Sequence, residues 1–288
     1  MTDEAQWTIR RVVRFCTDDF AQKGLPSPRL DAELVVAHAL GLDRVRLYMD
    51  LDRPLSKDEL AKVRELIVRR RKREPIAYIL GSREFYGRRF QVSPAVLVPR
   101  PDTETLIERA LAIVGEESNA RVLDLCTGSG CIAITLAAER AGIAVDATDL
   151  SAAALAVART NAGALGVAER VSFHEGDLFG AVPADARCAL VVSNPPYLAQ
   201  SELAGLDADV RAYEPHMALS AGSDALAFYR RIASEVSRWL EPGGTVLVEV
   251  GAGQAPEVER LFAAAGLLDV RTHADLGGHG RVVEGRAP

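Results

Sequence analysis

The sequence predicts an α/β protein in which a small helical N-terminal domain precedes a seven-stranded, mostly parallel, doubly wound sheet. Residues 1–80 show helical spacing of apolar side chains and no strand-like run. From Arg121 onward, short apolar strands alternate with helical segments, and a glycine loop follows the first strand. The 288 residues, 48% of them hydrophobic and 26% charged, are enough for one large or two modest domains.

The N-terminal domain, residues 1–80, is predicted to be helical throughout. The apolar spacing and the glycine and proline stops predict helices over 5–23, 28–40 and 56–73. Ser56, with Glu59 three residues later, is a capping-box pattern. The basic run Arg69–Arg73 falls in the last turn, where it complements the helix dipole. This run is either a solvated helix end or a docking surface for an acidic partner or an RNA.

Charge is distributed unevenly along the chain. Residues 1–98 hold 19 Lys and Arg and 14 Asp and Glu, a balance of +5. Residues 99–288 hold the other 15 and 26, a balance of −11. An enzyme that acts on nucleic acid usually has a basic field around its site. The acidic C-terminal part therefore argues against direct nucleic-acid binding.

Residues 81–98 are predicted to link the two domains. The first part has the composition of a β-hairpin with Gly87 at its turn, and residues 95–98 are predicted to form a second extended segment. Beyond the prolines that follow, Asp102 or Thr103 is placed to cap the next helix.

The C-terminal domain, residues 99–288, carries the alternating pattern. We predict strands near 121–125, 143–148, 170–174, 188–193, 244–250, 267–272 and 280–284. Helices are predicted near 130–140, 151–164, 223–239 and 254–265. Strands and helices joined by short loops indicate a doubly wound sheet. Residues 198–222 fit neither pattern and are interpreted as an irregular flap.

The glycine loop lies within Val122–Ala133, between a strand and a helix. Gly128 and Gly130 let the backbone approach a ligand closely and present N–H groups at the helix N-terminus. Asp149, 21 residues past Gly128 at the end of the second strand, can accept from both hydroxyls of a ribose. The spacing also fits a dinucleotide fingerprint, so NAD and a purely structural turn stay open as alternatives.

Two further acids favour S-adenosylmethionine over NAD. Asp124, in the strand before the loop, is placed to meet a cationic amino-acid moiety rather than a pyrophosphate. Asp177, after the third strand, is placed to accept from an adenine N6 amino group. Three acids at the ends of three consecutive strands suit S-adenosylmethionine, which we predict as the cofactor.

The fourth strand ends in Asn194-Pro195-Pro196-Tyr197. Two prolines end a strand abruptly and hold the following groups in one extended geometry. The Asn194 side-chain carbonyl, main-chain carbonyls without strand partners and the Tyr197 ring then offer fixed acceptors beside a flat wall. Such a site suits a planar NH2 group on an sp2 carbon. The alternative is a strand-terminating turn with a local hydrogen bond from Asn194.

Several kinds of protein are not supported by the sequence. The four cysteines include no Cys-x-x-Cys, and the five histidines lie far apart, so neither a metal site nor a disulfide framework is predicted. This cysteine usage is typical of the reducing cytoplasm. No signal peptide and no apolar run long enough for a membrane span is found, so no membrane partner is expected.

The glycine loop, Asp149 and Asn-Pro-Pro-Tyr, in this order, resemble a class I methyltransferase with its Rossmann-like fold. Arg83–Tyr86, Val98–Glu104 and the helical N-terminal domain extend the likeness, so that nearly the whole chain resembles the release factor glutamine methyltransferases (the PrmC/HemK family). That resemblance implies methyl transfer from S-adenosylmethionine to the glutamine side-chain amide of the Gly-Gly-Gln loop in class 1 peptide chain release factors. The alternative is a nucleic-acid methyltransferase acting on adenine N6 or a guanine amino group.

The resemblance also implies roles for individual residues. The methionine side of the cofactor would be lined by Cys126, Thr127, Gly128, Ser129 and Gly130. Asp149 would hold the ribose, Asp177 and Leu178 would flank the adenine, and Asn194 would also lie beside the cofactor. The substrate glutamine would be held by Asn194, Pro195, Pro196 and Tyr197, of which Asn194, Pro195 and Tyr197 are the predicted catalytic residues. Cys126 departs from the family's usual glycine and Leu178 from a frequent aromatic residue, and residues 1–80 would dock the protein substrate.

Overall fold

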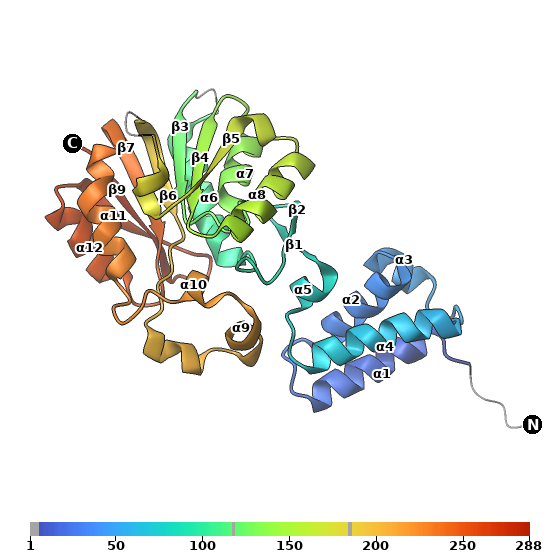
Figure 1. Ribbon diagram of the computed structural model, residues 1–288. Helices are drawn as coiled ribbons and strands as arrows, with labels where there is room; N and C mark the ends of the chain where they lie inside the picture. The colour runs from blue at the N-terminus through green and yellow to red at the C-terminus, as the bar shows by residue number, and fades with distance from the viewer. Residues whose placement is uncertain (1–5, 117–118, 184–185) are drawn as a thin grey trace, which may run out of the picture. The chain divides into compact units, whose positions relative to one another are not determined.

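The computed structural model describes residues 6–116, 119–183 and 186–288, which form two compact units (Figure 1). One unit is helical, extends to Ser82 and also includes the distant segment Asp207–Tyr213. The other comprises Arg83–Leu206 and Glu214–Pro288 and contains the sheet. No helix in these described ranges is long and apolar enough to cross a membrane.

Five helices from the first part of the chain build the helical unit. They are α1 (Ile9–Gln22), α2 (Pro28–Leu40), α3 (Arg44–Met49), α4 (Lys57–Arg71) and α5 (Ile76–Leu80). Thr8 caps α1 by accepting from the Arg11 N–H, so the helix begins later than the predicted residue 5, which itself lies outside the described residues. The predicted capping box of Ser56 and Glu59 is confirmed at the start of α4. Buried faces of α1, α2 and α4 form one apolar core.

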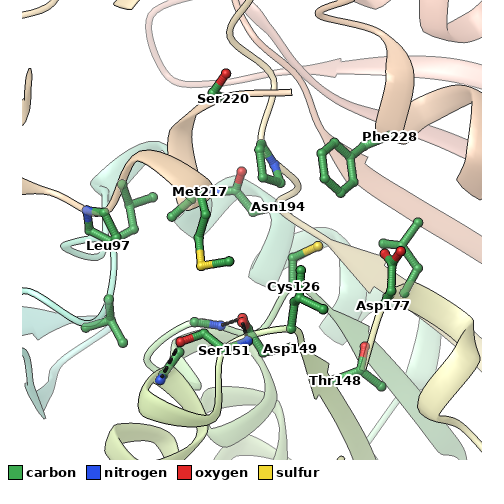
Figure 2. A pocket seen from close by; sticks show the side chains of 18 of the residues that line it. Leu97, Cys126, Thr148, Asp149, Ser151, Asp177, Asn194, Met217, Ser220 and Phe228 are labelled. Carbon is green, nitrogen blue, oxygen red and sulfur yellow. Dashed lines mark hydrogen bonds between the residues drawn. The ribbon is translucent and has the colours of Figure 1, made fainter. Parts of the chain in front are cut away.

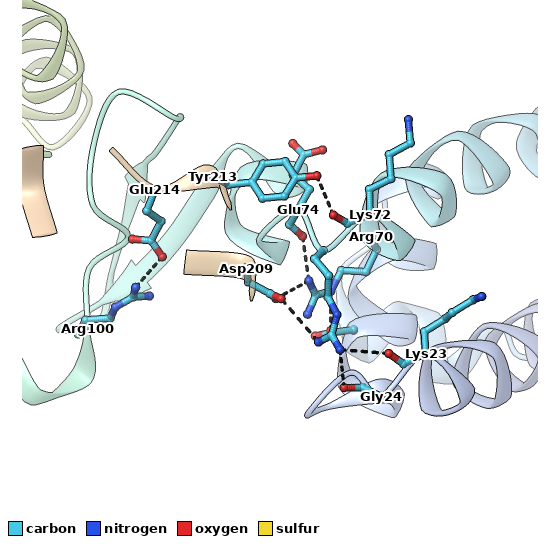
Figure 3. A network of polar contacts seen from close by, with 11 residues as sticks. Lys23, Gly24, Arg70, Lys72, Glu74, Arg100, Asp209, Tyr213 and Glu214 are labelled. Carbon is cyan, nitrogen blue, oxygen red and sulfur yellow. Dashed lines mark hydrogen bonds and ion pairs between the residues drawn. The ribbon is translucent and has the colours of Figure 1, made fainter. Parts of the chain in front are cut away.

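The arginines of the basic run at the end of α4 are paired with acidic side chains. Arg70 is 3% exposed; its Nε donates to Asp31 Oδ2 at 2.8 Å and its Nη1 to Asp209 Oδ2 at 2.7 Å (Figure 3). The neighbouring arginines are also paired, Arg69 with Glu74 and Arg71 with Asp19. Because a buried guanidinium needs carboxylate partners, Arg70 helps to hold the helical unit together and is not part of a solvated helix end. Docking of an acidic partner or an RNA on the rest of the run stays a prediction.

Residues 198–222 contain three short helices rather than an irregular flap. These are η4 (Gln200–Gly205), α9 (Ala208–Tyr213) and α10 (His216–Leu219). The base of the excursion is closed by hydrogen bonds from Leu198 N to Leu219 O, at 3.1 Å, and from Ala221 N to Leu198 O, at 2.8 Å. Its tip, α9, packs in the helical unit, where the Tyr213 hydroxyl donates to Lys72 O at 2.8 Å (Figure 3).

The second unit is built on a seven-stranded sheet with the order β5-β4-β3-β6-β7-β9-β8. Its strands are β3 (Arg121–Leu125), β4 (Ala144–Asp149), β5 (Val171–Glu175), β6 (Cys188–Ser193), β7 (Leu240–Glu249), β8 (Leu268–Ala274) and β9 (Gly280–Arg286). Neighbouring strands from β3 to β7 pair in parallel, and β9 is antiparallel to both β7 and β8. The predicted fold class is confirmed, although β7 begins at Leu240 rather than near residue 244.

Helices cover both faces of this sheet (Figure 1). One face packs against α6 (Glu104–Val114), α7 (Cys131–Glu139) and α8 (Ala152–Ala164), and the other against α11 (Ala227–Glu235) and α12 (Ala255–Ala264). Side chains alternate between the faces, so that Val122 of β3 belongs to the first apolar cluster and Leu123 to the second. Each strand is therefore buried on both sides, as the short apolar runs predicted.

The linker region is only partly as predicted. β1 (Ser82–Phe85) and β2 (Arg88–Gln91) form the expected hairpin, with both turn residues, Tyr86 and Gly87, at positive φ. Residues 95–98 are not a strand, because the Val98 N–H donates to the Glu214 carboxylate instead of a strand neighbour. Neither predicted side chain caps α6, which continues directly from the 3₁₀ turn η1 (Pro101–Thr103).

The parallel register brings the ends of four strands into one row. Leu125 of β3 is opposite Thr148 of β4 and Ser193 of β6, and Ser193 is opposite Val248 of β7. The next residue on each strand, or the first beyond it, therefore lies at the same edge of the sheet. Those residues are Cys126, Asp149, Asn194 and Glu249. The order in which the chain adds strands reverses between β3 and β6, since β4 and β5 lie on one side of β3 and β6 and β7 on the other. Ligands bind at such a switch point, outside the carboxyl ends of the strands.

Candidate active site

A cavity of about 280 Å³ opens at this edge, entirely within the sheet-containing unit. Figure 2 shows Cys126, Asp149, Asp177 and Asn194 around it. The predicted residues that line it are Cys126, Gly128, Asp149, Asp177, Leu178, Asn194 and Pro196. The predicted residues that do not line it are Thr127, Ser129, Gly130, Pro195 and Tyr197. The structure thus brings the glycine loop and the Asn-Pro-Pro-Tyr segment to one cavity, although some residues of each do not line it.

The glycine loop depends on conformations that favour glycine. Gly128 has φ +57° and Gly130 φ +79°, both in the left-handed region. A Cβ on Gly130 would lie 2.6 Å from Ile134 Cδ1, whereas one on Gly128 would meet no atom within 4 Å. Gly130 is therefore required by packing under the loop, and Gly128 leaves space beside the cavity.

Asp149 ties the loop to the end of β4. Its Oδ2 accepts from the Gly128 N–H at 2.8 Å, and its Oδ1 accepts from the Ser151 N–H at 2.9 Å (Figure 2). Burial raises the pKa of Asp149, and these two backbone hydrogen bonds act in the opposite direction. Each oxygen keeps a further lone pair, so the carboxylate can still accept from a diol at the cavity wall.

Asp124 does not line the cavity, which corrects its predicted contact with a cationic moiety. It is fully buried beneath the loop, where its Oδ2 accepts from Thr127 Oγ1 at 2.6 Å and from the Ala133 N–H at 3.2 Å. Burial raises the pKa of this carboxyl to about 7. Its Oδ1 has no hydrogen-bond partner among the described residues. Asp124 therefore anchors the loop from below.

Two other cavity residues adopt a backbone conformation that is unusual for their type. Cys126 has φ +60° and Leu178 φ +49°. A side chain in the left-handed region costs about 1–2 kcal/mol. The departure of Cys126 from glycine is therefore not neutral, because glycine would adopt this φ without that cost. Burial also raises the pKa of the Cys126 thiol, which keeps it protonated.

Asp177, unlike the other acids, is largely exposed and already has a cationic neighbour. Its Oδ2 lies 2.9 Å from Arg231 Nη2, and the Arg231 guanidinium lies over the Phe228 ring at 5.8 Å. Both residues belong to α11 and line the cavity. Figure 2 shows Phe228 on the same side of the cavity as Asp177. Phe228 and Arg231 were not predicted, because α11 lies about 50 residues after Asp177 in the sequence. Phe228 therefore provides an aromatic ring in the cavity wall, whereas Leu178 has an aliphatic side chain.

Asn194 presents a defined side-chain orientation in the cavity wall. Its Nδ2 donates to Thr103 Oγ1 at 3.3 Å, so the amide nitrogen is engaged by protein. The side-chain oxygen is then the group left to accept from a ligand. Asn194 is half-buried and lines the cavity, as predicted.

Glu249, the last residue of β7, lies behind Asn194 and was not predicted. It is 1% exposed, and its Oε2 has no partner among the described residues. Burial raises the pKa of its carboxyl to about 7, opposed by hydrogen bonds from Thr103 and Asn194 and by the charge of Arg281. An acid at the end of an otherwise apolar strand was the sequence signal that could have identified it.

Tyr197 is held by its backbone rather than exposed in the cavity. Its carbonyl accepts from Gln254 Nε2 at 2.8 Å, and Gln254 Oε1 accepts from the Gly251 N–H at 3.0 Å. The Tyr197 ring is half-buried against the second apolar cluster. Gln254 therefore fixes the end of the Asn-Pro-Pro-Tyr segment from the loop before α12.

The cavity has the donor set that S-adenosylmethionine requires. A carboxylate at the end of β4 faces it, the Gly128 backbone is open to it, and the buried Thr148 hydroxyl in its wall has no partner among the described residues. An unpartnered buried hydroxyl is uncommon and suits a site completed by a polar ligand. The residues present therefore fit this cofactor.

Comparisons with known proteins agree with this geometry. Residues 11–81 match the family model described as the PrmC N-terminal domain, and residues 103–208 match the methyltransferase small domain. A crystal structure of a methyltransferase from Pyrococcus furiosus, 16% identical, superposes with a TM-score of 0.52 over 70% of this chain and 90% of that one. This likeness shows the fold alone.

Two relatives that match nearly the whole chain show which family it belongs to. The release factor glutamine methyltransferase of Cereibacter sphaeroides is 47% identical over 276 residues, covering 96% of this chain and 97% of the relative. That of Geobacter sulfurreducens is 45% identical over 287 residues, covering 99% of each. Identity at this level over both units, together with the two domain matches, means that the chain belongs to the release factor glutamine methyltransferase family.

Proposed function

We propose that this protein transfers a methyl group from S-adenosylmethionine to the side-chain amide nitrogen of the glutamine in the Gly-Gly-Gln loop of class 1 release factors. The observation that carries this proposal is the Asn194 oxygen, held free by Thr103 in the cavity that the glycine loop also borders. Since release factors act on ribosomes, the reaction takes place in the cytoplasm.

The chemistry is limited by the substrate nitrogen. A glutamine amide is a poor nucleophile because its lone pair is delocalised into the carbonyl. When bound, S-adenosylmethionine supplies an electrophilic methyl group on a sulfonium, which leaves as a neutral thioether. A bond forms between nitrogen and the methyl carbon as the carbon–sulfur bond breaks, and the nitrogen then loses one proton to water.

The Asn194 oxygen and the Pro195 main-chain carbonyl accept the two amide N–H bonds. These acceptors aim the remaining face of the nitrogen and oppose the positive charge that develops on it. One such group contributes about 2.7–4 kcal/mol, by analogy with oxyanion-hole donors. Alignment of the reacting atoms accounts for roughly 7–11 kcal/mol more. Tyr197 packs against the amide plane once the substrate loop is seated.

The competing function is methylation of an exocyclic amino group in RNA or DNA, which presents the same planar NH2. Incubation with radiolabelled S-adenosylmethionine and release factor, RNA or DNA distinguishes the two. Label is expected in the release factor and not in nucleic acid. Label should also be lost when the glutamine of the Gly-Gly-Gln loop is replaced by alanine. Label in RNA or DNA alone would overturn the proposal.

The helical unit supplies docking contacts remote from the chemistry. A hollow of about 350 Å³ lies between α1 and α4, where Phe15 is 47% and Val68 43% exposed. Trp7 packs edge-on against Phe15, with ring centroids 5.8 Å apart. Arg64, also in the hollow, makes no ion pair with any described residue. An apolar surface with a free cation suits a protein partner with apolar and acidic side chains.

Paired substitutions test this docking role. We expect Phe15→Ser with Val68→Ser to raise KM for intact release factor about tenfold. Methylation of a short Gly-Gly-Gln peptide should be unchanged, since such a peptide lacks the release-factor surface that the hollow would bind. Val45→Ser with Met49→Ser, which changes exposed apolar residues elsewhere in the unit, is the matched control. Equal effects of the two pairs would contradict the docking role.

A further inference from the structure

The turn that follows β7 holds the last residue of the Asn-Pro-Pro-Tyr segment at two points. The Tyr197 carbonyl accepts from Gln254 Nε2 at 2.8 Å. The Tyr197 ring packs directly on the Gly251 backbone, where an added Cβ would lie 3.0 Å from Tyr197 Cδ2. Residues 251–254 therefore hold both the main chain and the ring of Tyr197, and we refer to them as the Tyr197-binding turn.

The direction of the Gln254 amide is fixed by groups that cannot exchange roles. Its Oε1 accepts from the Gly251 N–H at 3.0 Å, and its Nε2 donates to the Tyr197 carbonyl. A backbone N–H can only donate, and a backbone carbonyl can only accept. Rotation of the amide by half a turn would place donor against donor and acceptor against acceptor. Only the observed direction therefore satisfies both partners.

Further contacts leave the Gln254 side chain little freedom to move. The Tyr229 hydroxyl, on α11, lies 3.3 Å from Gln254 Oε1 and 3.0 Å from the Glu249 carbonyl oxygen, and Tyr229 is fully buried. The Gln254 N–H donates to the Gly251 carbonyl at 3.1 Å, which closes the turn through its own backbone. The Tyr197-binding turn is therefore held by α11 and by itself.

The position of the Pro195 carbonyl depends on where Tyr197 is held. Tyr197 ends a segment whose other end joins β6 at Ser193, which pairs within the sheet. Between these ends lie two prolines, both buried, each with φ restricted to about −65°. A short segment that is held at both ends, with restricted φ values between them, has few alternative courses.

We propose that Gln254 is a positioning residue for methyl transfer, which holds Tyr197 and thereby sets the Pro195 carbonyl that accepts from the substrate amide. Gln254 does not line the cavity. It therefore acts on the reaction through the Asn-Pro-Pro-Tyr segment and not by contact with substrate or cofactor. This inference rests on the proposed function, since it concerns the second of the two acceptors named there.

Two substitutions disturb the Tyr197-binding turn at different atoms. Gln254→Met keeps the length of the side chain and removes both amide hydrogen bonds. Gly251→Ala keeps Gln254 but inserts a Cβ 2.9 Å from Gln254 Oε1 and 3.0 Å from Tyr197 Cδ2, so these neighbours must shift. We expect each variant to lower kcat about 10- to 100-fold, since misplacement of a reacting group by about 1 Å costs about 100-fold.

Binding measurements and a matched control separate positioning from folding. Affinity for S-adenosylhomocysteine and KM for release factor should stay within about twofold of wild type in both variants, because the glycine loop and the helical unit are unchanged. Thr272→Val is the control, since it removes the 2.6 Å hydrogen bond from Thr272 Oγ1 to Glu259 of α12, which does not involve the turn. It should keep wild-type kcat at a comparable loss of Tm.

Two kinetic results would overturn the proposal. One is a purely structural pattern, in which cofactor affinity and kcat fall together or Thr272→Val loses kcat as the turn variants do. The other is wild-type kcat in both Gln254→Met and Gly251→Ala.

A measurement without turnover distinguishes this inference from the proposed function. In protein labelled with fluorotyrosine, the Tyr197 fluorine resonance is assigned by its loss in Tyr197→Phe. It should shift in Gln254→Met and Gly251→Ala and stay in place in Thr272→Val. These shifts without methylation of release factor by wild type would reject the substrate but support the holding of Tyr197. Methylation by wild type with an unmoved resonance in both turn variants would reject the positioning role alone.

Discussion

Two buried carboxylates support the two loops of the site, and they do so differently. Asp124 lies beneath the glycine loop and Glu249 behind Asn194; burial raises the pKa of each to about 7. Each also has one oxygen without a partner among the described residues. Asp124 accepts partly from a backbone N–H, that of Ala133. Glu249 is approached by the side chains of Thr103 and Asn194, which can turn.

The glycine loop and the Asn194 segment therefore make different contributions to the site. A carboxylate bound to backbone fixes the course of the chain, and the glycine loop must keep its course to admit a cofactor. Glu249 instead lies beside the side chains of Thr103 and Asn194, and Asn194 lines the cavity. Changes around Asp124 should therefore alter cofactor binding and stability, whereas changes around Glu249 should alter turnover.

The largest expected effect is the loss of turnover when Asn194, the proposed acceptor of the substrate amide, is replaced. Asn194→Ala removes the side-chain oxygen and should lower kcat by about 10²–10³. Affinity for S-adenosylhomocysteine should change little, because Asp149 and the glycine loop remain intact. Single-turnover methylation of release factor and calorimetric binding measure the two quantities. Near-normal turnover would contradict the role of Asn194, and a parallel loss of cofactor affinity would remove the distinction between the loops.

A smaller effect is expected in the glycine loop, where Gly130 and Gly128 provide a matched pair of substitutions. Gly130→Ala would bring a Cβ to 2.6 Å from Ile134 Cδ1 and 3.1 Å from Ala158 Cβ, at a φ of +79° that strains any side chain, so either the Ile134 side chain or the loop must shift. We expect it to weaken cofactor binding at least tenfold and to lower stability by about 1–3 kcal/mol. Gly128→Ala, with no atom within 4 Å, should cost only the backbone strain of about 1–2 kcal/mol.

The measurements are cofactor affinity and thermal unfolding of both glycine variants. If Gly128→Ala weakened cofactor binding as much as Gly130→Ala, close approach of the ligand to Gly128 would matter more than packing below the loop. Wild-type affinity in Gly130→Ala would show that the loop tolerates displacement. The packing of Gly130 against Ile134 would then have no effect on cofactor binding.

The sequence predicted those parts of the site that depend on local pattern. The seven strands, the glycine loop, Asp149 and Asn194 follow from periodicity, spacing and proline chemistry, and the sheet register brings them together. Thr103 and Glu249 could not be predicted, because their convergence on Asn194 depends on the sheet order and on where α6 starts. Arg70 was misassigned because its partner Asp209 belongs to a distant segment that joins the helical unit.

The smallest expected effect concerns the pH dependence of stability. The pKa of Asp124 is about 7 when folded, against an ordinary value of 3.8, so the folded state binds the proton more tightly. Stability from this group is therefore full below about pH 4 and is lost as pH rises to 7. Asp124→Asn cannot titrate, so its Tm relative to wild type should rise between pH 5 and pH 6.

We expect this relative rise to be about 2–4 °C, which corresponds to about 1 kcal/mol in a protein of this size. Glu249 is present in both proteins, so its titration cancels in the difference. Asp18→Asn, which changes an exposed acid of the helical unit, is the matched control. A constant difference for Asp124→Asn would show that Asp124 is not held in its protonated form beneath the loop. The two carboxylates would then not be comparable, because only Glu249 would titrate near pH 7.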